Sequence, residues 1–370
     1  MRFRPTVAEV DLDAIRHNVR LLKPPAAELM AVVKANGYGH GALPVATAAL
    51  GAGATWLGVA LVEEGIALRE ASIEAAILVL TEFPPGSEKD ALAAGLTPSL
   101  YSDQGLDRLA EAAHTFGEAK IGVHVKLDTG MHRVGLEPSE VVPFAKRIED
   151  SGLRIDGVWT HFARAEELDD LSIGKQLTLY TQAIEALAAA GVPVRYRHVA
   201  NSAATIALPE THFDLVRVGV ALYGISPGRA IDGRVALRPA MSLRSQVSLA
   251  KRVVAGEGVS YGLRYRLERD STIATVPVGY ADGYARALAE RGRVLIKGKR
   301  YPIAGTVTMD QLTVDCGDDE VEVGDEVVLF GRQDDEEITA DEVASWYGTI
   351  GYEVVCAVSD RVPREHRGTD

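Results

Sequence analysis

The sequence predicts an α/β protein in which an N-terminal (β/α)₈ TIM barrel is followed by a mainly β C-terminal domain. Strand-like and helix-like segments alternate regularly as far as Ile225, which is typical of βαβ units. The pattern then changes to short Val-, Thr- and Gly-rich segments. The chain has 370 residues, of which 47% are apolar, enough for the cores of two domains. We place the barrel at residues 1–235 and the β-rich domain at 236–370.

Eight short apolar segments are expected to form the barrel strands. They are 29–34, 56–61, 76–81, 97–102, 120–127, 157–162, 195–201 and 215–220. Helical patterns between them include Glu63–Ala71, Gln104–Phe116, Pro138–Ser151 and Lys175–Ala190. A doubly wound sheet is the competing fold, but it would not require eight strands. In addition, no G-x-G-x-x-G motif follows the first strand.

The remaining part of the chain is expected to be rich in β-structure. Strands are indicated over Ser271–Gly279, Arg293–Ile296 and Glu326–Phe330, and residues 297–299 read Lys-Gly-Lys, a turn between two of them. Only residues 339–347 have a helical pattern there.

Composition and charge restrict the class of protein. Lysine and arginine number 39 against 52 acidic residues, a net charge of −13, which argues against nucleic-acid and anionic membrane partners. No apolar run approaches the roughly 18 residues that span a bilayer, and no apolar stretch follows the basic N-terminus as in a signal peptide. Cys316 and Cys356 have no metal-ligand spacing, so we expect no metal site and a cytoplasmic protein.

A lysine at the end of the first barrel strand is the leading candidate for chemistry. Residues 31–41 read AVVKANGYGHG, so Lys34 follows a buried strand and precedes a glycine-rich turn. Such a lysine is poorly hydrated, and we expect its pKa to fall towards neutrality. It could then act as a nucleophile or base and hold pyridoxal 5′-phosphate (PLP) as a Schiff base. Taken alone, a strand-end lysine that reaches solvent is the simpler interpretation.

Further basic side chains follow the later strands, where active sites of this fold lie. They are Lys126, Arg133, His161, His198 and Arg217. Cations packed together cost free energy unless an anion lies among them, so we expect a phosphate or carboxylate there. Ser202 and the backbone N–H groups of Gly219 and Val220 fall at the usual phosphate site of the fold, near the last two strands.

The chain resembles the alanine racemases, a family of fold-type III PLP-dependent enzymes. The matching segments follow the family's order over nearly the whole chain. They are AVVKANGYGHG at 31–41, KLDTGMHRVG at 126–135, THFA at 160–163, HVANSAA at 198–204, RVGVALYG at 217–224, RPAMSL at 238–243, SYG at 260–262, GYADGY at 279–284, GTVTMDQ at 305–311 and GYEVVC at 351–356. The resemblance implies a homodimer with shared active sites and a small amino-acid substrate.

The resemblance also implies PLP-dependent interconversion of L- and D-alanine with two bases, supplying D-alanine for peptidoglycan. Lys34 would form the internal aldimine and act on one face of Cα, and Tyr261 of the partner subunit would act on the other. Arg217 would hydrogen-bond the pyridine nitrogen and, with His161, support Tyr261. The implied cofactor-binding residues are Lys34, Tyr38, Arg133, His161, Asn201, Ser202, Arg217, Gly219, Val220 and Tyr352. The implied substrate-binding residues are Arg133, Met309 and Tyr261, and Lys126 matches a lysine that is carbamylated in many members.

One departure from the family leaves the substrate range open. Thr306 stands where the family commonly has an arginine in the entrance layer, and a lost cation there could either loosen the preference for small substrates or slow recruitment of the substrate carboxylate. A broad-specificity or serine racemase of the same fold is therefore the alternative function. A fold-type III decarboxylase or a non-enzymatic PLP-binding protein fits less well, because residues 126–135 and Tyr261 match the racemases. The G-x-S-x-G match at 258–262 lacks the helix that a hydrolase needs after it.

Overall fold

The computed structural model describes residues 3–116 and 121–368, which form two compact units. The barrel unit comprises Ile15–Gly37 and Ala42–Leu237. The β unit comprises the described residues up to Ala14, Tyr38–Gly41 and the described residues from Arg238 onward. The predicted barrel domain, 1–235, begins earlier than the barrel unit. Residues 7–11 of the chain form a strand that pairs with strands of the β unit. The outer ends of the two predicted domains, Met1 and Asp370, lie outside the described residues.

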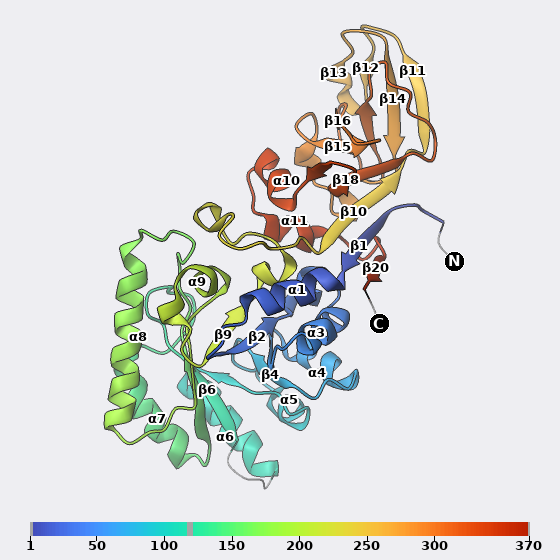
Figure 1. Ribbon diagram of the computed structural model, residues 1–370. Helices are drawn as coiled ribbons and strands as arrows, with labels where there is room; N and C mark the ends of the chain where they lie inside the picture. Colours follow the sequence, from blue (N-terminus) through green and yellow to red (C-terminus); the bar gives the residue numbers. More distant parts are fainter. Residues whose placement is uncertain (1–2, 117–120, 369–370) are drawn as a thin grey trace. The chain divides into compact units, whose positions relative to one another are not determined.

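The barrel unit confirms the predicted (β/α)₈ fold (Figure 1). Its strands, within the part of the chain that is described, are β2 (Glu28–Val32), β3 (Trp56–Val59), β4 (Ala76–Val79), β5 (Ser99–Leu100), β6 (Gly122–Lys126), β7 (Arg154–Trp159), β8 (Tyr196–His198) and β9 (Leu215–Val218). They pair in parallel in the orders β9-β2-β3-β4 and β5-β6-β7-β8. Backbone hydrogen bonds from Val79 to Thr97 and from Asp214 to Arg197 join the two sheets and close the barrel.

Helices cover the outside of these strands (Figure 1). They are α1 (Leu12–Leu22), α3 (Ala42–Gly51), α4 (Val62–Glu70), α5 (Glu88–Ala93), α6 (Asp103–Phe116), α7 (Val141–Asp150), α8 (Leu171–Ala189) and α9 (Ser202–Ala207). The short segment α2 (Lys34–Tyr38) follows β2 and is largely left-handed. Parallel strands covered in this way are buried on both faces, which is why most of their residues are apolar. All four residues of β3, for example, are buried. Residue 120, the first of the predicted strand 120–127, lies outside the described residues.

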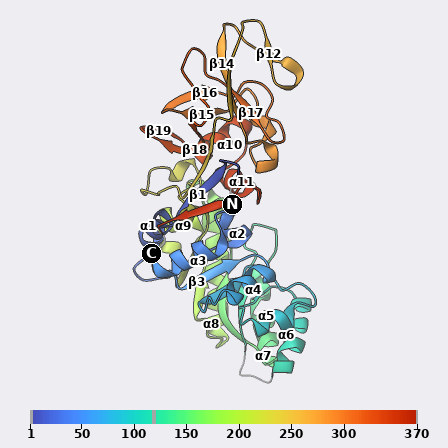
Figure 2. The ribbon, with the colours of Figure 1, turned by 90° about the vertical axis from the view of Figure 1, so that its right-hand side faces the viewer.

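The β unit contains one long mixed sheet and smaller antiparallel pairings (Figure 2). The long sheet has the order β16-β15-β18-β10-β1-β20, and β19 pairs with β18. The two smaller sheets have the orders β11-β14-β17 and β12-β13. The strands are β1 (Val7–Asp11), β10 (Met241–Gln246), β11 (Leu249–Val253), β12 (Gly258–Val259), β13 (Tyr265–Arg266), β14 (Ser271–Val276), β15 (Arg293–Ile296), β16 (Lys299–Pro302), β17 (Leu312–Asp315), β18 (Glu326–Gln333), β19 (Glu336–Ile338) and β20 (Arg364–Arg367). The predicted turn after β15 is confirmed, because Lys297 and Gly298 both have the positive φ of a tight hairpin.

The expectation of a single helix in this part of the chain was wrong. α10 (Ala340–Tyr347) is the helix that the sequence indicated, but α11 (Gly351–Ala357) is a second one. α11 begins with a glycine and contains two β-branched valines, and both features lower helix propensity. Val354 and Val355 are buried, so packing of this face outweighs the weak local preference.

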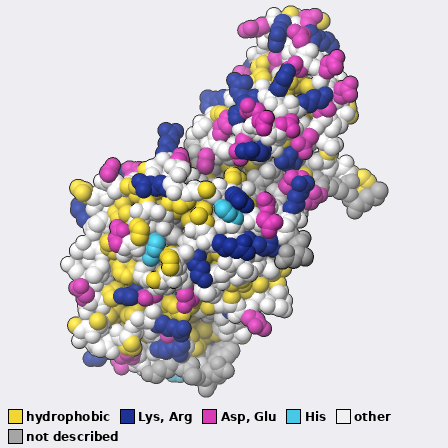
Figure 3. Space-filling model, in the orientation of Figure 1, with side chains coloured by type: hydrophobic (Ala, Val, Ile, Leu, Met, Phe, Trp, Pro, Cys, Tyr) yellow, Lys and Arg dark blue, Asp and Glu magenta, His cyan; other side chains and the backbone are white. Residues whose placement is uncertain are grey.

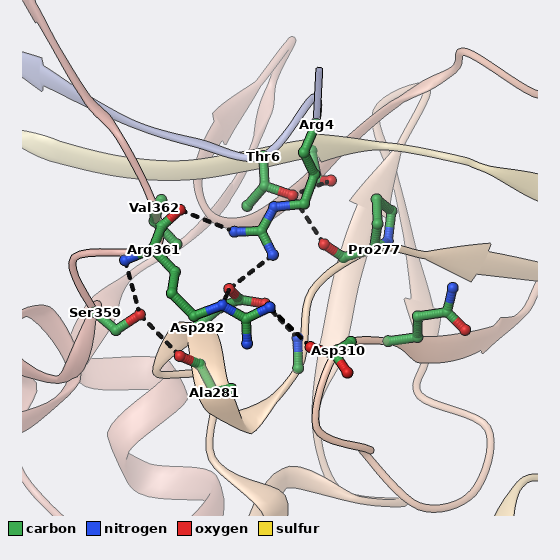
Figure 4. A network of polar contacts seen from close by, with 12 residues as sticks. Arg4, Thr6, Pro277, Ala281, Asp282, Asp310, Ser359, Arg361 and Val362 are labelled. Atoms are coloured by element: carbon green, nitrogen blue, oxygen red, sulfur yellow. Dashed lines mark hydrogen bonds and ion pairs between the residues drawn. The ribbon is translucent and has the colours of Figure 1, made fainter. Parts of the chain in front are cut away.

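A buried carboxylate joins distant segments of the β unit (Figure 4). Asp282 is fully buried, and Arg4 donates from Nη1 to its Oδ1 at 2.8 Å. The N–H of Gly279 donates to the other carboxylate oxygen at 3.0 Å. Arg361 lies 3.8 Å from Asp282 and forms a 2.8 Å ion pair with Asp310. These partners are needed because a buried charge without them would be strongly destabilising.

The surface of the β unit carries charges of both signs. In Figure 3, lysine and arginine side chains lie among aspartate and glutamate side chains over its visible face. Within residues 3–116 and 121–368, the structure contains no helix long and apolar enough to cross a membrane.

We expect Asp282→Ala to lower the free energy of unfolding by about 3 kcal/mol, because it removes the buried carboxylate that accepts from Nη1 of Arg4 and from the N–H of Gly279. Urea unfolding followed by tryptophan fluorescence measures this, since Trp346 lies in α10 of the same unit. Asp310→Ala is the matched control. It removes an ion pair whose carboxylate is 59% exposed and should cost less than about 1 kcal/mol. Equal stability of the two variants would contradict the expectation.

Candidate active site

The predicted site residues belong to both units. Those in the barrel unit are Lys34, Lys126, Arg133, His161, Asn201, Ser202, Arg217, Gly219 and Val220. Those in the β unit are Tyr38, Tyr261, Met309 and Tyr352. The barrel residues lie at or just after the carboxyl ends of β2, β6, β7, β8 and β9, the end at which this fold places its active sites.

Arg217, in β9, is a buried cation held by backbone carbonyls. Its residue exposure is 3%, and Nη1 donates to the carbonyl of His198 at 2.8 Å. Nη2 donates to the carbonyls of Thr160 at 2.7 Å and Val199 at 3.2 Å. In the described part of the chain no carboxylate contacts this guanidinium. Burial lowers the pKa of Arg217 to about 9, which still leaves it charged at neutral pH.

Two histidines accept hydrogen bonds from Arg217. Nη1 lies 3.2 Å from Nδ1 of His198, and Nη2 lies 3.2 Å from Nδ1 of His161. A guanidinium can only donate, so both Nδ1 atoms are acceptors and each neutral ring has its proton on Nε2. Burial is the main cause that lowers the pKa of both rings well below its usual value, and the charge of Arg217 adds to the effect. Both histidines are therefore neutral at physiological pH.

His124, in the middle of β6, extends this chain and was not identified from the sequence. Its Nδ1 lies 2.9 Å from Nε2 of His198. Since that Nε2 holds the proton, His124 is the acceptor. Burial lowers the pKa of His124 to about 4. Gly157 of β7 leaves room for the ring, since a Cβ there would lie 2.5 Å from Nδ1 of His124, a contact that the sequence alone does not indicate.

Lys126, at the end of β6, lies in the same cationic cluster. Its Nζ is 4.6 Å from the centroid of the Trp159 ring, and Cζ of Arg217 is 4.8 Å from that centroid. The aromatic face offers both cations some stabilisation in place of water. Burial first, and then the charges of Arg133 and Arg217, lower the pKa of Lys126 to about 8. A substantial fraction of this amine is therefore neutral and nucleophilic near physiological pH.

Lys34 is half-buried at the start of α2, and the backbone after it is left-handed. Residues 35–37 have φ between 52° and 61°, which costs about 1–2 kcal/mol for each residue other than glycine. Glu64 stabilises the turn by accepting from the N–H of Ala35 at 2.6 Å and from the N–H of Ala60 at 2.8 Å. The sequence indicated the turn, but not that non-glycine residues adopt this conformation, and Glu64 was not identified from it.

Ser202, Gly219 and Val220 lie together near the ends of β8 and β9. The Oγ of Ser202 accepts from the N–H of Gly219 at 2.9 Å, and Val220 begins the next 3₁₀ turn. Because its Oγ accepts from that N–H, the Ser202 hydroxyl keeps its own proton to donate, as a phosphate group requires. Asn201 has a structural role here, because its Oδ1 caps α9 by accepting from the N–H of Ala204 at 3.1 Å.

The predicted residues of the β unit lie on loops and on α11. Tyr261 follows β12 and is 74% exposed, and Met309 is 52% exposed in the loop before β17. The ring centroids of Tyr38 and Tyr352 are 6.5 Å apart. Burial raises the pKa of Tyr38.

Comparison with known proteins identifies the same family as the sequence motifs. The profile of the alanine racemase N-terminal domain matches residues 10–227, and that of the C-terminal domain matches residues 240–366. The alanine racemase of Symbiobacterium thermophilum is 49% identical, covering 99% of this chain and 98% of that protein. The alanine racemase of Carboxydothermus hydrogenoformans is 46% identical, covering 98% of this chain and 99% of that protein.

Solved structures agree over the whole chain. The alanine racemase of D-cycloserine-producing Streptomyces lavendulae superimposes with a TM-score of 0.95 at 42% identity, covering 100% of this chain and 99% of that one. The alanine racemase of Bacillus anthracis with bound L-Ala-P gives a TM-score of 0.93 at 41% identity, covering 100% of this chain and 97% of that one.

We expect His124 to stay neutral down to roughly pH 5, because burial holds its pKa at about 4, below the ordinary 6.5. Between those values the unfolded chain binds a proton that the folded chain does not, so stability falls as the pH falls. Nitrogen-15 NMR of the histidine rings, assigned with His124→Gln, measures the titration. An imidazolium signal from His124 near pH 6 would contradict the expectation.

Proposed function

The chain belongs to the alanine racemase family, and we propose that it interconverts L-alanine and D-alanine with PLP as cofactor and two bases. The observation that carries the proposal is the buried guanidinium of Arg217, which is surrounded by neutral acceptors and has no carboxylate beside it among the described residues. Such a group is suited to donate a hydrogen bond to a neutral heterocyclic nitrogen without losing its own proton.

The residues of the barrel unit fit PLP. The hydrogen bonds of Arg217 use Nη1 and Nη2, so its Nε–H has no protein acceptor within the described chain and is available to a pyridine nitrogen. The hydroxyl of Ser202 suits the phosphate, because its Oγ accepts from the N–H of Gly219 and its own proton remains to be donated, and the amine of Lys34 suits the aldehyde carbon. When bound, PLP stabilises the negative charge that develops at Cα as its proton leaves.

Racemisation needs a proton acceptor on each face of Cα, because the proton leaves from one side and returns on the other. We assign these roles to Nζ of Lys34 and to the hydroxyl of the partner subunit's Tyr261. A free tyrosine has a pKa of about 10 and needs hydrogen-bond donors and nearby positive charge to act as a base at neutral pH. Nδ1 of His161 accepts from Arg217, so its Nε2–H remains to donate to the tyrosine oxygen.

Arg217 also limits side reactions. Because Arg217 would donate a hydrogen bond without giving up its proton, it would hold the pyridine nitrogen of PLP unprotonated, and PLP would then withdraw less charge from Cα. A shorter-lived charge at Cα leaves less opportunity for transamination, which suits a racemase.

The remaining assignments follow from the family. We propose that Arg133 and the backbone N–H of Met309 bind the substrate carboxylate. Tyr38, Asn201, Val220 and Tyr352 stay predicted cofactor-binding residues. The homodimer with shared sites, cytoplasmic localisation and supply of D-alanine for peptidoglycan belong to the same proposal.

The test is to incubate the holoenzyme with L-alanine in D₂O and to follow optical rotation and deuterium at Cα. We expect both to change together, with activity abolished in Lys34→Ala and reduced by a factor of about 100 or more in Tyr261→Phe. L-Serine in parallel decides the alternative of a serine or broad-specificity racemase, which Thr306 keeps open. If neither amino acid exchanges while the yellow Schiff base is present, the assignment is wrong and other amino acids and decarboxylation come next.

We further propose that Lys126 is carbamylated and that the carbamate stabilises Arg133 through its negative charge. Carbamylation needs a neutral amine, and a pKa of about 8 supplies one near physiological pH. With carbon-13-labelled bicarbonate, NMR should show one protected carbamate signal that is missing in Lys126→Gln. The same spectrum from both proteins would contradict the modification.

A further inference from the structure

We propose that Thr306 is a positioning residue whose hydroxyl holds the backbone of Tyr261. The inference rests on the proposed role of Tyr261 as the second base. Thr306 differs from the arginine common in the family, and in this chain its hydroxyl orients the loop that carries the proposed base.

Two hydrogen bonds join the loop of Thr306 to the loop of Tyr261, both within the β unit. Oγ1 of Thr306 donates to the carbonyl oxygen of Tyr261 at 3.0 Å. In return, Oγ of Ser260 donates to the carbonyl oxygen of Thr306 at 2.8 Å. The first bond joins Thr306 to Tyr261, and the second joins Ser260 to Thr306. An arginine at position 306 would have no hydroxyl, so the first of them depends on the residue that this chain has.

The backbone at Ser260 explains why such bonds are required. Ser260 has φ 64° and ψ −172°, a combination that is essentially restricted to glycine. A residue other than glycine keeps this conformation only where its surroundings enforce it. Since Tyr261 comes next in the chain, the conformation of Ser260 sets the direction in which the tyrosine leaves the hairpin.

The two loops are also in direct backbone contact. Gly305 has φ +80°, and a Cβ there would lie 2.5 Å from the carbonyl oxygen of Val259. No side chain fits between the loops at that point, so the adjacent hydroxyl of Thr306 can reach the Tyr261 carbonyl. On the far side of the hairpin, the hydroxyl of Tyr265 donates to Oδ2 of Asp315 at 3.0 Å. The loop of Tyr261 is thus anchored on both sides, and Thr306 provides the anchor next to the reacting residue.

Positive charge is already plentiful beside Thr306. A cavity of about 420 Å³ in the β unit is lined by Thr306 together with Arg264, Arg286 and Arg291, with Glu290 as the acidic residue in the same lining. A further guanidinium at position 306 would add like-charge repulsion to this group. The short threonine side chain avoids that cost and leaves its hydroxyl for the tyrosine loop.

The test compares three variants of the holoenzyme with the parent. Thr306→Val keeps the shape of the side chain and removes the hydroxyl, Thr306→Ser keeps the hydroxyl, and Thr306→Arg restores the common family residue. We expect Thr306→Val and Thr306→Arg to lower kcat about tenfold, because a base displaced by a fraction of an ångström transfers protons less efficiently. Thr306→Ser should stay within about twofold of the parent.

The decisive readout is the ratio of Cα deuterium incorporation with retained configuration to racemisation, measured for each enantiomer in D₂O. If Tyr261 is poorly aligned, Lys34 removes the proton of one enantiomer and returns a deuteron to the same face. The ratio should therefore rise for that enantiomer in Thr306→Val and return to the parental value in Thr306→Ser. A variant that merely contains less folded enzyme would lose both reactions equally and leave the ratio unchanged.

A second readout does not depend on activity. Hydrogen–deuterium exchange of the backbone over residues 258–266 should be faster in Thr306→Val than in the parent and in Thr306→Ser. Parental exchange and a parental ratio in Thr306→Val would overturn the inference.

Tyr261→Phe, measured alongside, separates the inference from the proposed function. If Tyr261→Phe racemises at the parental rate, Tyr261 is not the base, and the proposed function and the inference fall together. If Tyr261→Phe is strongly impaired while Thr306→Val matches the parent, only the inference fails.

Discussion

Arg217 has to be solvated by the protein itself, because its guanidinium is buried in the barrel and no carboxylate contacts it among the described residues. Carbonyls at the ends of β7 and β8 provide part of this solvation, and the lone pairs of His161 and His198 provide the rest. A guanidinium only donates, so it fixes the direction of every hydrogen bond that leaves it. Because Nδ1 of His198 accepts from Arg217, the proton of this ring lies on Nε2. Nδ1 of His124 is therefore the acceptor of the next hydrogen bond.

The same burial accounts for the chemistry around it. Lys126 and Arg217 lie over one tryptophan ring, and their mutual repulsion, together with burial, keeps the lysine amine partly neutral. The charge of Lys34 adds to the lowering of the pKa of His161. Neutral histidines and a cluster of cations together provide positive charge that stabilises an anionic ligand. The proposed phosphate-bearing cofactor and the substrate carboxylate have that character.

Much of the barrel could be predicted because its strands are buried on both faces and its basic residues follow them directly in the chain. The partners of those residues could not, since His124 meets His198 only after the barrel closes. The pairing of Val7–Asp11 with strands more than two hundred residues away, and the packing that makes α11 helical, are likewise tertiary effects. Thr306 shows a different limit: the sequence indicates a missing cation, whereas only the structure reveals the hydroxyl bonded to the Tyr261 carbonyl.

Neutron diffraction from deuterium-exchanged crystals of the holoenzyme would locate the protons on which the arrangement around Arg217 depends. We expect a fully protonated guanidinium, a deuteron on Nε2 of both His161 and His198, and no deuteron on their Nδ1 atoms. A deuteron on Nδ1 of His198, or a guanidinium that has lost one, would contradict this expectation.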